Sequence, residues 1–249
     1  MEMAKKWRTQ AQRSTFYLGK RMDKAIREHN MIQAGDRILV GVSGGKDSMA
    51  LLRLLIERQR LAEAKFDLVS AHVRGDARGV GANVPVEFAQ WIENERQAHI
   101  ISDMTLPEGE SLPMNCERCS RNRRKTLFEL AQAHECNKIA LGHHMEDFAH
   151  TALLNLFSSG RLETMAFRRD YFGGRISVIR PLAYIHECEI ARFAQISEFP
   201  IIQNDCPMIS QSKRGRIKEI MKPIYHEFRS AYSNIIQASG IIGEDGPSD

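Results

Sequence analysis

The sequence predicts an α/β protein with a parallel, five-stranded, Rossmann-like sheet that is covered by helices on both faces. Short apolar runs rich in β-branched residues alternate along the chain with longer segments of helical periodicity. A turn of small residues at 43–45 joins the first apolar run to a helical segment, as in proteins that bind phosphate at a helix N-terminus. The composition, 43% hydrophobic and 27% charged, is ordinary for a globular chain.

The expected elements follow from these patterns. Strands are expected at about 37–43, 66–73, 98–105, 138–142 and 176–180. Helices are expected at about 15–31, 47–63, 84–97, 119–135, 145–158, 186–197 and 212–232. Residues 1–14 are polar and basic and should fray, and residues 159–175 should form a loop. Because ligands bind at the carboxyl ends of parallel strands, the loops after these strands should meet at one edge of the sheet.

The turn after the first strand has a specific pattern. From Ser43 to Ser48 it reads Ser-Gly44-Gly45-Lys-Asp-Ser, which is neither the Walker pattern nor G-x-G-x-x-G. It closely resembles the PP-loop of the N-type ATP pyrophosphatases. That resemblance implies cleavage of ATP between its α and β phosphates and transfer of AMP to an oxygen.

Each residue type in this turn suits a nucleotide. The paired glycines let the backbone approach a phosphate, and Lys46 with the turn amides can neutralise the triphosphate. Ser43 and Ser48 can donate their hydroxyls to it. Asp47 can hold Mg²⁺ that bridges phosphate oxygens, or it can simply be an acid that suits the positive end of the helix.

A second polar group follows the fourth strand. It comprises Gly142, His143, His144, Glu146 and Asp147. Two imidazoles and two carboxylates beside a nucleotide edge can bind Mg²⁺ or transfer protons. We therefore expect this loop to complete the nucleotide site.

Five cysteines in a chain without a signal peptide are expected to be metal ligands, redox groups or core residues rather than disulfides. Cys116 and Cys119 form a C-x-x-C pattern at the start of a helix, and Cys206 lies far downstream. Three cysteines suit an iron–sulfur cluster with one open iron. Zinc with a histidine as fourth ligand and a redox disulfide are the alternatives. Cys136 and Cys188 are interpreted as core or boundary residues.

Positive charge is clustered rather than general. The net charge is only +4, but the helix after the C-x-x-C pattern carries Arg118, Arg121, Arg123, Arg124 and Lys125. Its apolar positions leave these charges on one face, where they can contact an RNA backbone or simply be solvated. No aromatic residues are interleaved, so we do not expect a base-stacking platform here.

With these residues assembled, the chain resembles the tRNA 2-thiocytidine synthetase family. The stretches that carry the resemblance are Ser43–Ser48, Cys116–Arg121 with the basic helix, Ile139–His144, Val178–Tyr184, Glu189–Ala194, Phe199–Ile202 and Ser210–Gln211. The resemblance implies an adenine nucleotide α-hydrolase-like fold and ATP-dependent thiolation of C2 of a cytidine in the tRNA anticodon loop. It also implies Mg²⁺, a 4Fe-4S cluster on Cys116, Cys119 and Cys206, and a separate cysteine desulfurase as sulfur donor.

The chain departs from the family pattern at several positions. Glu146-Asp147 stands where the family has Asp-Asp, His150 stands where it has Glu, and its second C-x-x-C is reduced to Cys206. These departures leave open another thiolated base or a small-molecule substrate. Two further alternatives are a ligase like tRNA-lysidine synthetase, which has no use for the cysteines, and a non-catalytic nucleotide-binding regulator.

The length of 249 residues suggests one large domain with short additions. We divide it into an N-terminal basic arm and helix (1–34), a PP-loop ATPase domain (35–200), a C-terminal cysteine-bearing segment and helix (201–239) and a disordered tail (240–249). No apolar run approaches the roughly 20 residues that span a bilayer, so we expect a cytoplasmic protein without membrane contact. The oligomeric state is left open, a homodimer included.

Overall fold

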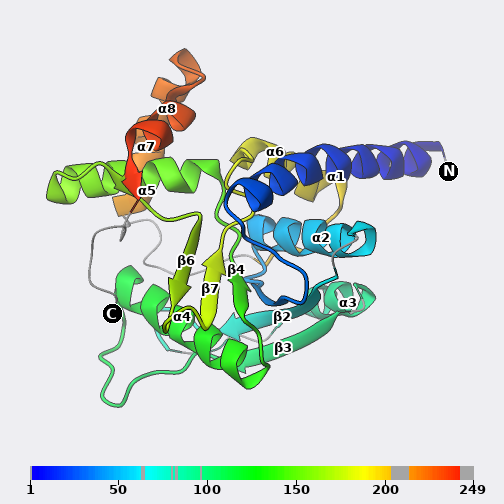
Figure 1. Ribbon diagram of the computed structural model, residues 1–249, viewed down its shortest axis with the longest axis horizontal. Helices are drawn as coiled ribbons and strands as arrows, with labels where there is room; N and C mark the ends of the chain where they lie inside the picture. The colour runs from blue at the N-terminus through cyan, green and yellow to red at the C-terminus, as the bar shows by residue number, and fades with distance from the viewer. Residues whose placement is uncertain are drawn as a thin grey trace.

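The computed structural model describes residues 2–62, 65–79, 81, 84–95, 97–202 and 213–241, with the backbone alone for residues 2–8. Its centre is a sheet with the strand order β3-β2-β1-β4-β7-β6 (Figure 1). The parallel strands are β1 (Arg37–Gly41), β2 (Asp67–Arg74), β3 (Ala98–Asp103), β4 (Lys138–Ala140) and β7 (Ile176–Ile179). The predicted α/β class with its parallel strands is therefore confirmed.

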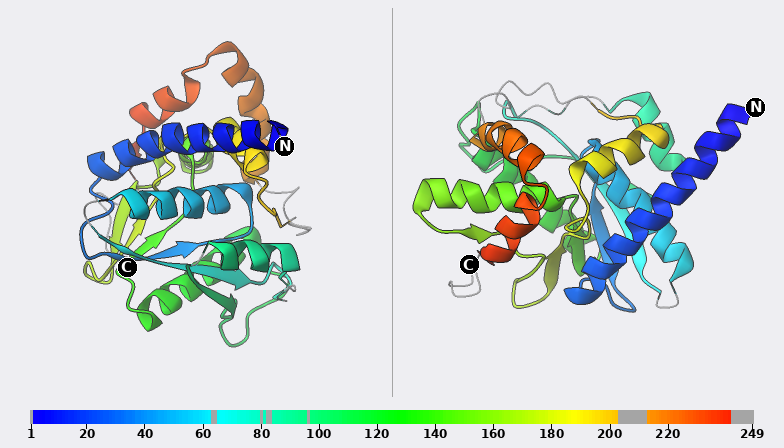
Figure 2. Two further views of the ribbon diagram at one scale, coloured as in Figure 1. Left: turned by 90° about the vertical axis from the view of Figure 1, so that its right-hand side faces the viewer. Right: turned by 90° about the horizontal axis from the view of Figure 1, so that it is seen from above.

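Helices cover both faces of this sheet. The described helices are α1 (Glu2–Glu28), α2 (Lys46–Leu61), α3 (Val86–Asn94), α4 (Cys116–Ala133), α5 (Met145–Ser159), α6 (Glu187–Ile196), α7 (Lys213–Glu227) and α8 (Ala231–Ala238). Helices α1 and α2 are stacked above one face, and α4 lies below the other (Figure 2, left). None of the described helices is long and apolar enough to cross a membrane.

Alternating side chains of the buried strands form two cores. Ile38 and Val40 of β1 belong to the core under α1, α2, α3 and α6, whereas Leu39 between them belongs to the core under α4. All three side chains are fully buried, as expected for a strand covered on both faces. This packing fixes the register of β1 and thereby the position of the turn that follows it.

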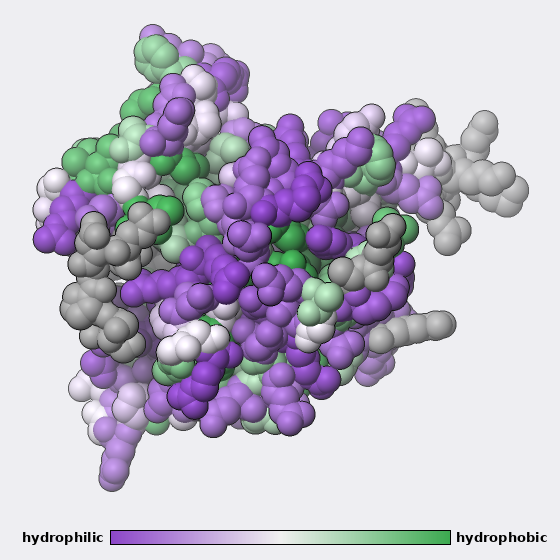
Figure 3. Space-filling model, viewed as in Figure 1, coloured by the Kyte–Doolittle hydropathy of each residue, from purple (hydrophilic) through white to green (hydrophobic). Residues whose placement is uncertain are grey.

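A third core lies away from the sheet, where α5, α7 and α8 pack together around Ile217, Met221 and Tyr232. Hydrophobic residues are gathered on the surface over these helices, whereas the surface over α4 and the sheet is mostly hydrophilic (Figure 3). Phe157 at the end of α5 and Phe228 after α7 are both exposed.

The N-terminal helix is longer than expected, since α1 begins at Glu2. The first half of α1, residues 2–15, is rich in Ala, Lys, Gln and Arg, which favour helices, and this half contains no Gly or Pro. Its second half is fixed by packing: Met22 and Ile26 are buried, and Asp23 pairs with Arg58 of α2 at 3.1 Å. The anchored half can therefore propagate the helix back towards the N-terminus.

Three other expectations differ from the structure. The expected loop at 159–175 contains β5 (Glu163–Thr164) and β6 (Arg168–Tyr171), an antiparallel edge strand on β7. The expected disordered tail starts with β8 (Gly240–Ile241), which pairs with β5. The long C-terminal helix is broken at 228–230 into α7 and α8, so that α8 can fold back onto α5.

Candidate active site

The site forms where the direction of strand addition reverses. From β1 the chain proceeds outward through β2 and β3, and then returns to add β4 and β7 on the other side. Ligands bind at such switch points in open α/β sheets. The loops after β1 and β4 meet here, as predicted from the positions of the strands.

Gly142 brings these two loops into backbone contact. A Cβ atom at this position would lie 3.0 Å from both the carbonyl carbon of Asp47 and the amide nitrogen of Ser48. Any larger residue would push the loop after β4 away from the first turn of α2. The phosphate-binding turn and the histidine–acid loop therefore form one unit.

The turn itself is held by the side chain of Ser48. Its Oγ accepts a hydrogen bond from the Ser43 amide at 3.1 Å and donates one to the Gly45 carbonyl at 2.9 Å. Gly44 has a φ of +82°, a conformation that favours glycine. Ser48, which we expected to donate to phosphate, uses its hydroxyl within the turn. Both Ser43 and Ser48 line a cavity beside the turn.

A cavity of about 300 Å³ opens beside this turn. The nucleotide loops contribute Ser43, Asp47, Ser48, Gly142, His143 and Asp147, and α4 contributes Ser120, Arg123, Arg124 and Leu127. The predicted nucleotide loops and the start of the basic helix therefore face each other across one cavity.

Three of the residues that line this cavity have a buried polar atom without a hydrogen-bond partner: Oδ1 of Asp47, Nδ1 of His143 and Nε of Arg123. Burial, aided by the nearby charge of Arg180, lowers the pKa of His143 to about 3, so the imidazole is neutral at pH 7. Burial acts to raise the pKa of Asp147, but the positive charge of the neighbouring His144 outweighs it and keeps that pKa low. An unsatisfied carboxylate oxygen beside a second ionised carboxylate is a suitable donor set for Mg²⁺.

Glu146 has a different environment from its neighbour Asp147. It is buried, with its carboxylate 3.0 Å from Nδ1 of His144 and 3.0 Å from Nδ1 of His186, and it accepts the Glu187 amide at 2.9 Å. Burial acts to raise the pKa of Glu146, but the two histidines outweigh it and hold that pKa well below its usual range. Burial acts to lower the pKa of His144, but Glu146 and Asp147 outweigh it and raise that pKa. Glu146 thus joins α5 to α6 and does not line the cavity.

Lys46 is held by an ion-pair network. Its Nζ lies 3.1 Å from Asp47 and 3.0 Å from Glu187 of α6, and the same Glu187 oxygen accepts from Lys218 of α7 at 2.7 Å. Burial acts to lower the pKa of Lys46, but Asp47 and Glu187 outweigh it and raise that pKa. Burial acts to raise the pKa of Glu187, but Lys218 and Lys46 outweigh it and lower that pKa to about 2. Two of the three N–H donors of Lys46 are thus engaged with Asp47 and Glu187, which leaves one for a phosphate.

Sequence reasoning gave no role to Arg180, which follows β7. It is buried, one of its Nη atoms donates to the Ala166 carbonyl at 2.6 Å, and its Nε has no partner. No acidic side chain in the described part of the chain forms an ion pair with it. Burial, with Arg124 and Arg169 nearby, lowers its pKa to about 10, so it still carries its charge at neutral pH. Its position in the Val178–Tyr184 stretch of the family pattern was the signal that could have identified it.

The C-x-x-C pattern opens α4. Cys116 is exposed and Cys119 is half-buried, and the N-cap Asn115 accepts the Arg118 amide at 2.8 Å. Ser120, the next residue, lines the cavity. Within the residues that the structure covers, no three His, Cys, Asp or Glu side chains are grouped to hold a metal.

Cys206 lies outside the described residues, as does the rest of 203–212. Ile202, the last described residue before them, donates its amide to the Gly44 carbonyl at 2.9 Å. A Cβ on Gly44 would also lie 2.5 Å from Ile202. The segment that carries Cys206 therefore starts at the PP-loop. Of the other cysteines, Cys136 is buried and Cys188 is exposed.

The basic residues of α4 fall into two groups: some form ion pairs with acidic side chains, and others line the cavity. Three of its cations are paired with acids: Arg118 with Glu110 at 2.9 Å, Arg121 with Glu117 at 3.4 Å and Lys125 with Glu129 at 3.7 Å. Arg123 donates to the Gly75 carbonyl and lines the cavity. Arg124 also lines the cavity and forms no ion pair or hydrogen bond with the described residues. Arg123 and Arg124 are therefore the two that face the nucleotide site.

Aromatic rings lie next to the basic residues of α4, although none is interleaved with them in the sequence. Phe128 of α4 contacts Tyr171 and Phe172 of the β6–β7 turn, with ring centroids 5.0 and 5.2 Å apart. These rings come from segments more than 40 positions apart, so sequence spacing along α4 could not have revealed them.

Comparison with known proteins agrees with this geometry. The PP-loop domain family matches residues 17–239. A tRNA-cytidine(32) 2-sulfurtransferase of Geobacter metallireducens is 38% identical over 223 residues, which cover 86% of this chain and 85% of the relative. One from Hahella chejuensis is 34% identical over 95% of this chain and 84% of the relative.

The structure of the U34-tRNA thiolase NcsA from Methanococcus maripaludis with its [4Fe-4S] cluster shares the fold. Its TM-score is 0.69 at 19% identity, over 90% of this chain and 78% of that one. Together with the matches in sequence, the switch-point site identifies the chain as a member of the tRNA-cytidine(32) 2-sulfurtransferase family of PP-loop enzymes.

Proposed function

We propose that this enzyme uses ATP to activate the C2 oxygen of a cytidine in a tRNA anticodon loop and then replaces that oxygen with sulfur. The observation that carries the proposal is the cavity whose two walls are the PP-loop and the first turns of α4. One wall suits a nucleotide, and the other begins directly after a pair of cysteines. A ligase such as tRNA-lysidine synthetase would need only the first wall.

In the activating step, the C2 oxygen of the base attacks the α-phosphorus of ATP, and the bond to the β-phosphate breaks to release pyrophosphate. The amides of Gly44 and Gly45 and the positive end of α2 bind the leaving phosphates. Lys46 donates its remaining N–H to these phosphates. Asp47 and Asp147 would hold Mg²⁺; this is supported by the buried Oδ1 of Asp47, which has no hydrogen-bond partner and only a 4.0 Å ion pair with Nε2 of His144.

In the second step, a sulfur nucleophile at the oxidation level of sulfide attacks C2, and the C–O bond breaks to release AMP. A ring oxygen is a poor leaving group, whereas AMP is a good one, which is why ATP is needed. Cys116, Cys119 and Cys206 would hold a 4Fe-4S cluster, which would supply the sulfur for this transfer. Thiolates are the soft ligands that such a cluster requires, and the two described cysteines share the first turn of α4.

Several roles follow for other residues and partners. His143 is neutral and half-buried, and its buried Nδ1 can accept a hydrogen bond from the substrate. Arg123 and Arg124 can bind phosphates of the tRNA at the cavity mouth. A cysteine desulfurase would supply the sulfur, and action on tRNA would place the enzyme in the cytoplasm.

The test asks whether the cysteines and the PP-loop have separate roles. Cys119→Ala should abolish thiolation while ATP affinity, measured by calorimetry, stays within about twofold. Cys188→Ala, at an exposed cysteine of α6, is the matched control and should retain both. Thiolation is measured by mass spectrometry of tRNA nucleosides. A deletion strain with unchanged 2-thiocytidine would overturn the proposal, and loss of ATP binding in folded Cys119→Ala protein would contradict the division of roles.

A further inference from the structure

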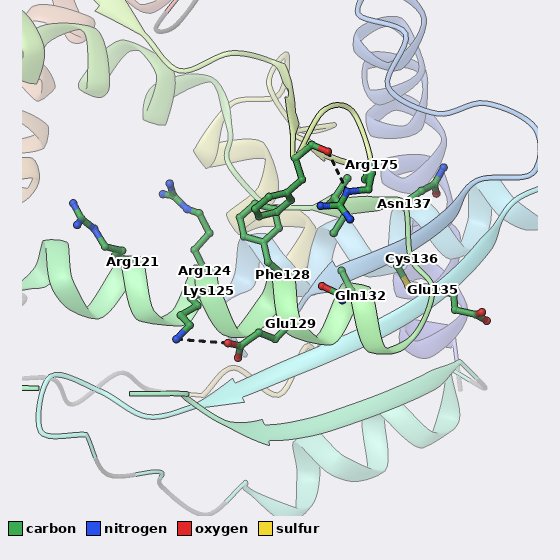
Figure 4. Close-up of a pocket in the computed structure, with 13 residues that line it drawn as sticks. Arg121, Arg124, Lys125, Phe128, Glu129, Gln132, Glu135, Cys136, Asn137 and Arg175 are labelled. Atoms are coloured by element: carbon green, nitrogen blue, oxygen red, sulfur yellow. Dashed lines mark hydrogen bonds and ion pairs between the residues drawn. The ribbon is translucent and has the colours of Figure 1, made fainter. Parts of the chain in front are cut away.

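A second cavity, of about 710 Å³, lies beside the nucleotide site. It is bounded by the second half of α4 and by the turn between β6 and β7 (Figure 4). Arg124 lines both cavities, so the two adjoin. The volume falls within the roughly 300–1,000 Å³ that is usual for ligand sites.

The walls of this second cavity carry surplus positive charge. Arg121, Arg124, Lys125 and Arg175 line it, against Glu129 and Glu135. Lys125 is paired with Glu129, and Arg175 uses its Nε to donate to the Phe172 carbonyl at 3.2 Å, the two contacts drawn as dashed lines in Figure 4. An arginine has five N–H donors, so Arg175 retains others for a ligand.

Phe172 supplies an exposed aromatic surface. Its side chain is 49% exposed and lies edge-on to Phe128, with an interplanar angle of 85°. Its φ is +55°, which is uncommon for a bulky residue and costs conformational energy. Gly173 and Gly174 also have positive φ, so the whole turn adopts the left-handed conformation that presents this ring. An apolar ring held at the surface by a strained turn indicates a role in contact rather than in folding.

We propose that this second cavity binds an unpaired nucleotide of the tRNA anticodon loop that neighbours the reacting cytidine. Its base stacks on Phe172, and its phosphates contact Arg124 and Arg175. Aromatic rings combined with arginines form the usual recognition surface for single-stranded RNA, whereas an acidic protein segment would have no need of the exposed ring. The inference rests on the proposed function, because it assumes tRNA as the substrate.

The test measures affinity for an unmodified tRNA transcript by fluorescence anisotropy over a range of salt concentrations. Phe172→Ala should weaken binding by about tenfold or more with the salt dependence unchanged, because stacking on one aromatic ring is lost. Arg124→Gln should instead reduce the slope of log K against log salt by about 0.7–0.9, the contribution of one phosphate contact. Phe172→Tyr should restore wild-type binding. Phe157→Ala, at an exposed aromatic of α5 away from this cavity, is the matched control and should bind as the wild type does.

The outcomes distinguish this inference from the proposed function. If wild-type protein binds and thiolates tRNA while Phe172→Ala binds as well as Phe157→Ala, the nucleotide cavity is refuted and the proposed function stands. If Phe172→Ala weakens binding only together with a lower melting temperature, and Phe172→Tyr does not restore it, Phe172 is structural and the inference also fails. If the wild-type protein does not bind tRNA, both proposals fail.

Discussion

Gly142 illustrates how one missing side chain organises the site. It allows the loop after β4 to touch the backbone of α2 at 3.0 Å. We predict that Gly142→Ala folds but displaces the PP-loop, because the added methyl group has no room. Overpacking of this kind costs about 1–3 kcal/mol. We expect at least tenfold weaker ATP binding, measured by calorimetry.

Gly19→Ala is the control for this substitution. Gly19 lies within α1, and a Cβ there would meet no atom within 4 Å. This change should stabilise the protein by about 0.5–1 kcal/mol, because alanine favours a helix more than glycine does. Equal ATP affinity in the Gly142 and Gly19 variants would show that the contact between the loops is not required.

Single residues also mark the limit of prediction from sequence. The turn at 43–48 was identifiable because its pattern is local, and its position at a strand end could be inferred from the strand before it. The partner of Lys46 could not be inferred, because Glu187 is 141 positions away and the two meet only through the packing of α6. The role of Ser48 within its own turn depends on hydrogen bonds that residue type alone does not specify.

At the scale of elements, Glu187 connects α6 to the PP-loop and to α7. Its folded-state pKa is about 2, below the ordinary value of 4.5. A depressed carboxylate pKa stabilises the fold above the unfolded-state value, and this contribution is lost as the pH falls from about 4.5 towards 2. The destabilisation caused by Glu187→Gln should therefore be largest near pH 7 and should shrink by pH 3.5, as measured by urea unfolding.

An exposed acid on α7 provides the control for this prediction. Among the described residues Glu219 pairs only with Lys222 in the same helix, and both side chains are largely exposed. Exposed pairs of this kind contribute about 0–1 kcal/mol. Glu219→Gln should thus have little effect at any pH. A Glu187→Gln effect that is constant from pH 7 to 3.5 would contradict the ion-pair network.

Elements with a strong periodic pattern were predicted well. The parallel strands lie within a few residues of their expected positions because each lies in a short stretch with apolar residues that ends near a turn or loop. The edge strand β6 was missed because Arg168–Tyr171 is charged and does not alternate, and its pairing comes from β7. The break between α7 and α8 was missed because it serves packing of α8 on α5, a long-range contact.

For the molecule as a whole, binding of nucleotide should raise the free energy of unfolding and the melting temperature. A ligand present at 100 times its Kd stabilises the folded state by about 2.7 kcal/mol, or about 5–10 °C in melting temperature for a chain of this size. We predict such a shift with ATP and Mg²⁺, and a much smaller one with ATP and EDTA. Asp47→Asn should remove the difference between the two conditions, because Oδ1 of Asp47 is the proposed Mg²⁺ ligand.

Thermal denaturation with each ligand combination tests this prediction. Asp76→Asn is a suitable control, since Asp76 pairs with Arg78 two residues away and does not line the nucleotide cavity. A Mg²⁺-dependent shift of equal size in Asp47→Asn would exclude Asp47 as a ligand.

The ion pair between Lys46 and Glu187 links nucleotide binding to the attachment of α7. Glu187 is shared between Lys46 and Lys218, so a phosphate that takes Lys46 changes how strongly α7 is attached to the rest of the fold. Linkage is reciprocal: whatever alters the attachment of α7 must alter the affinity for ATP by the same factor. Since α7 directly follows the segment that contains Cys206, the two half-reactions proposed above would be coupled through one carboxylate, and each would respond to the occupancy of the other.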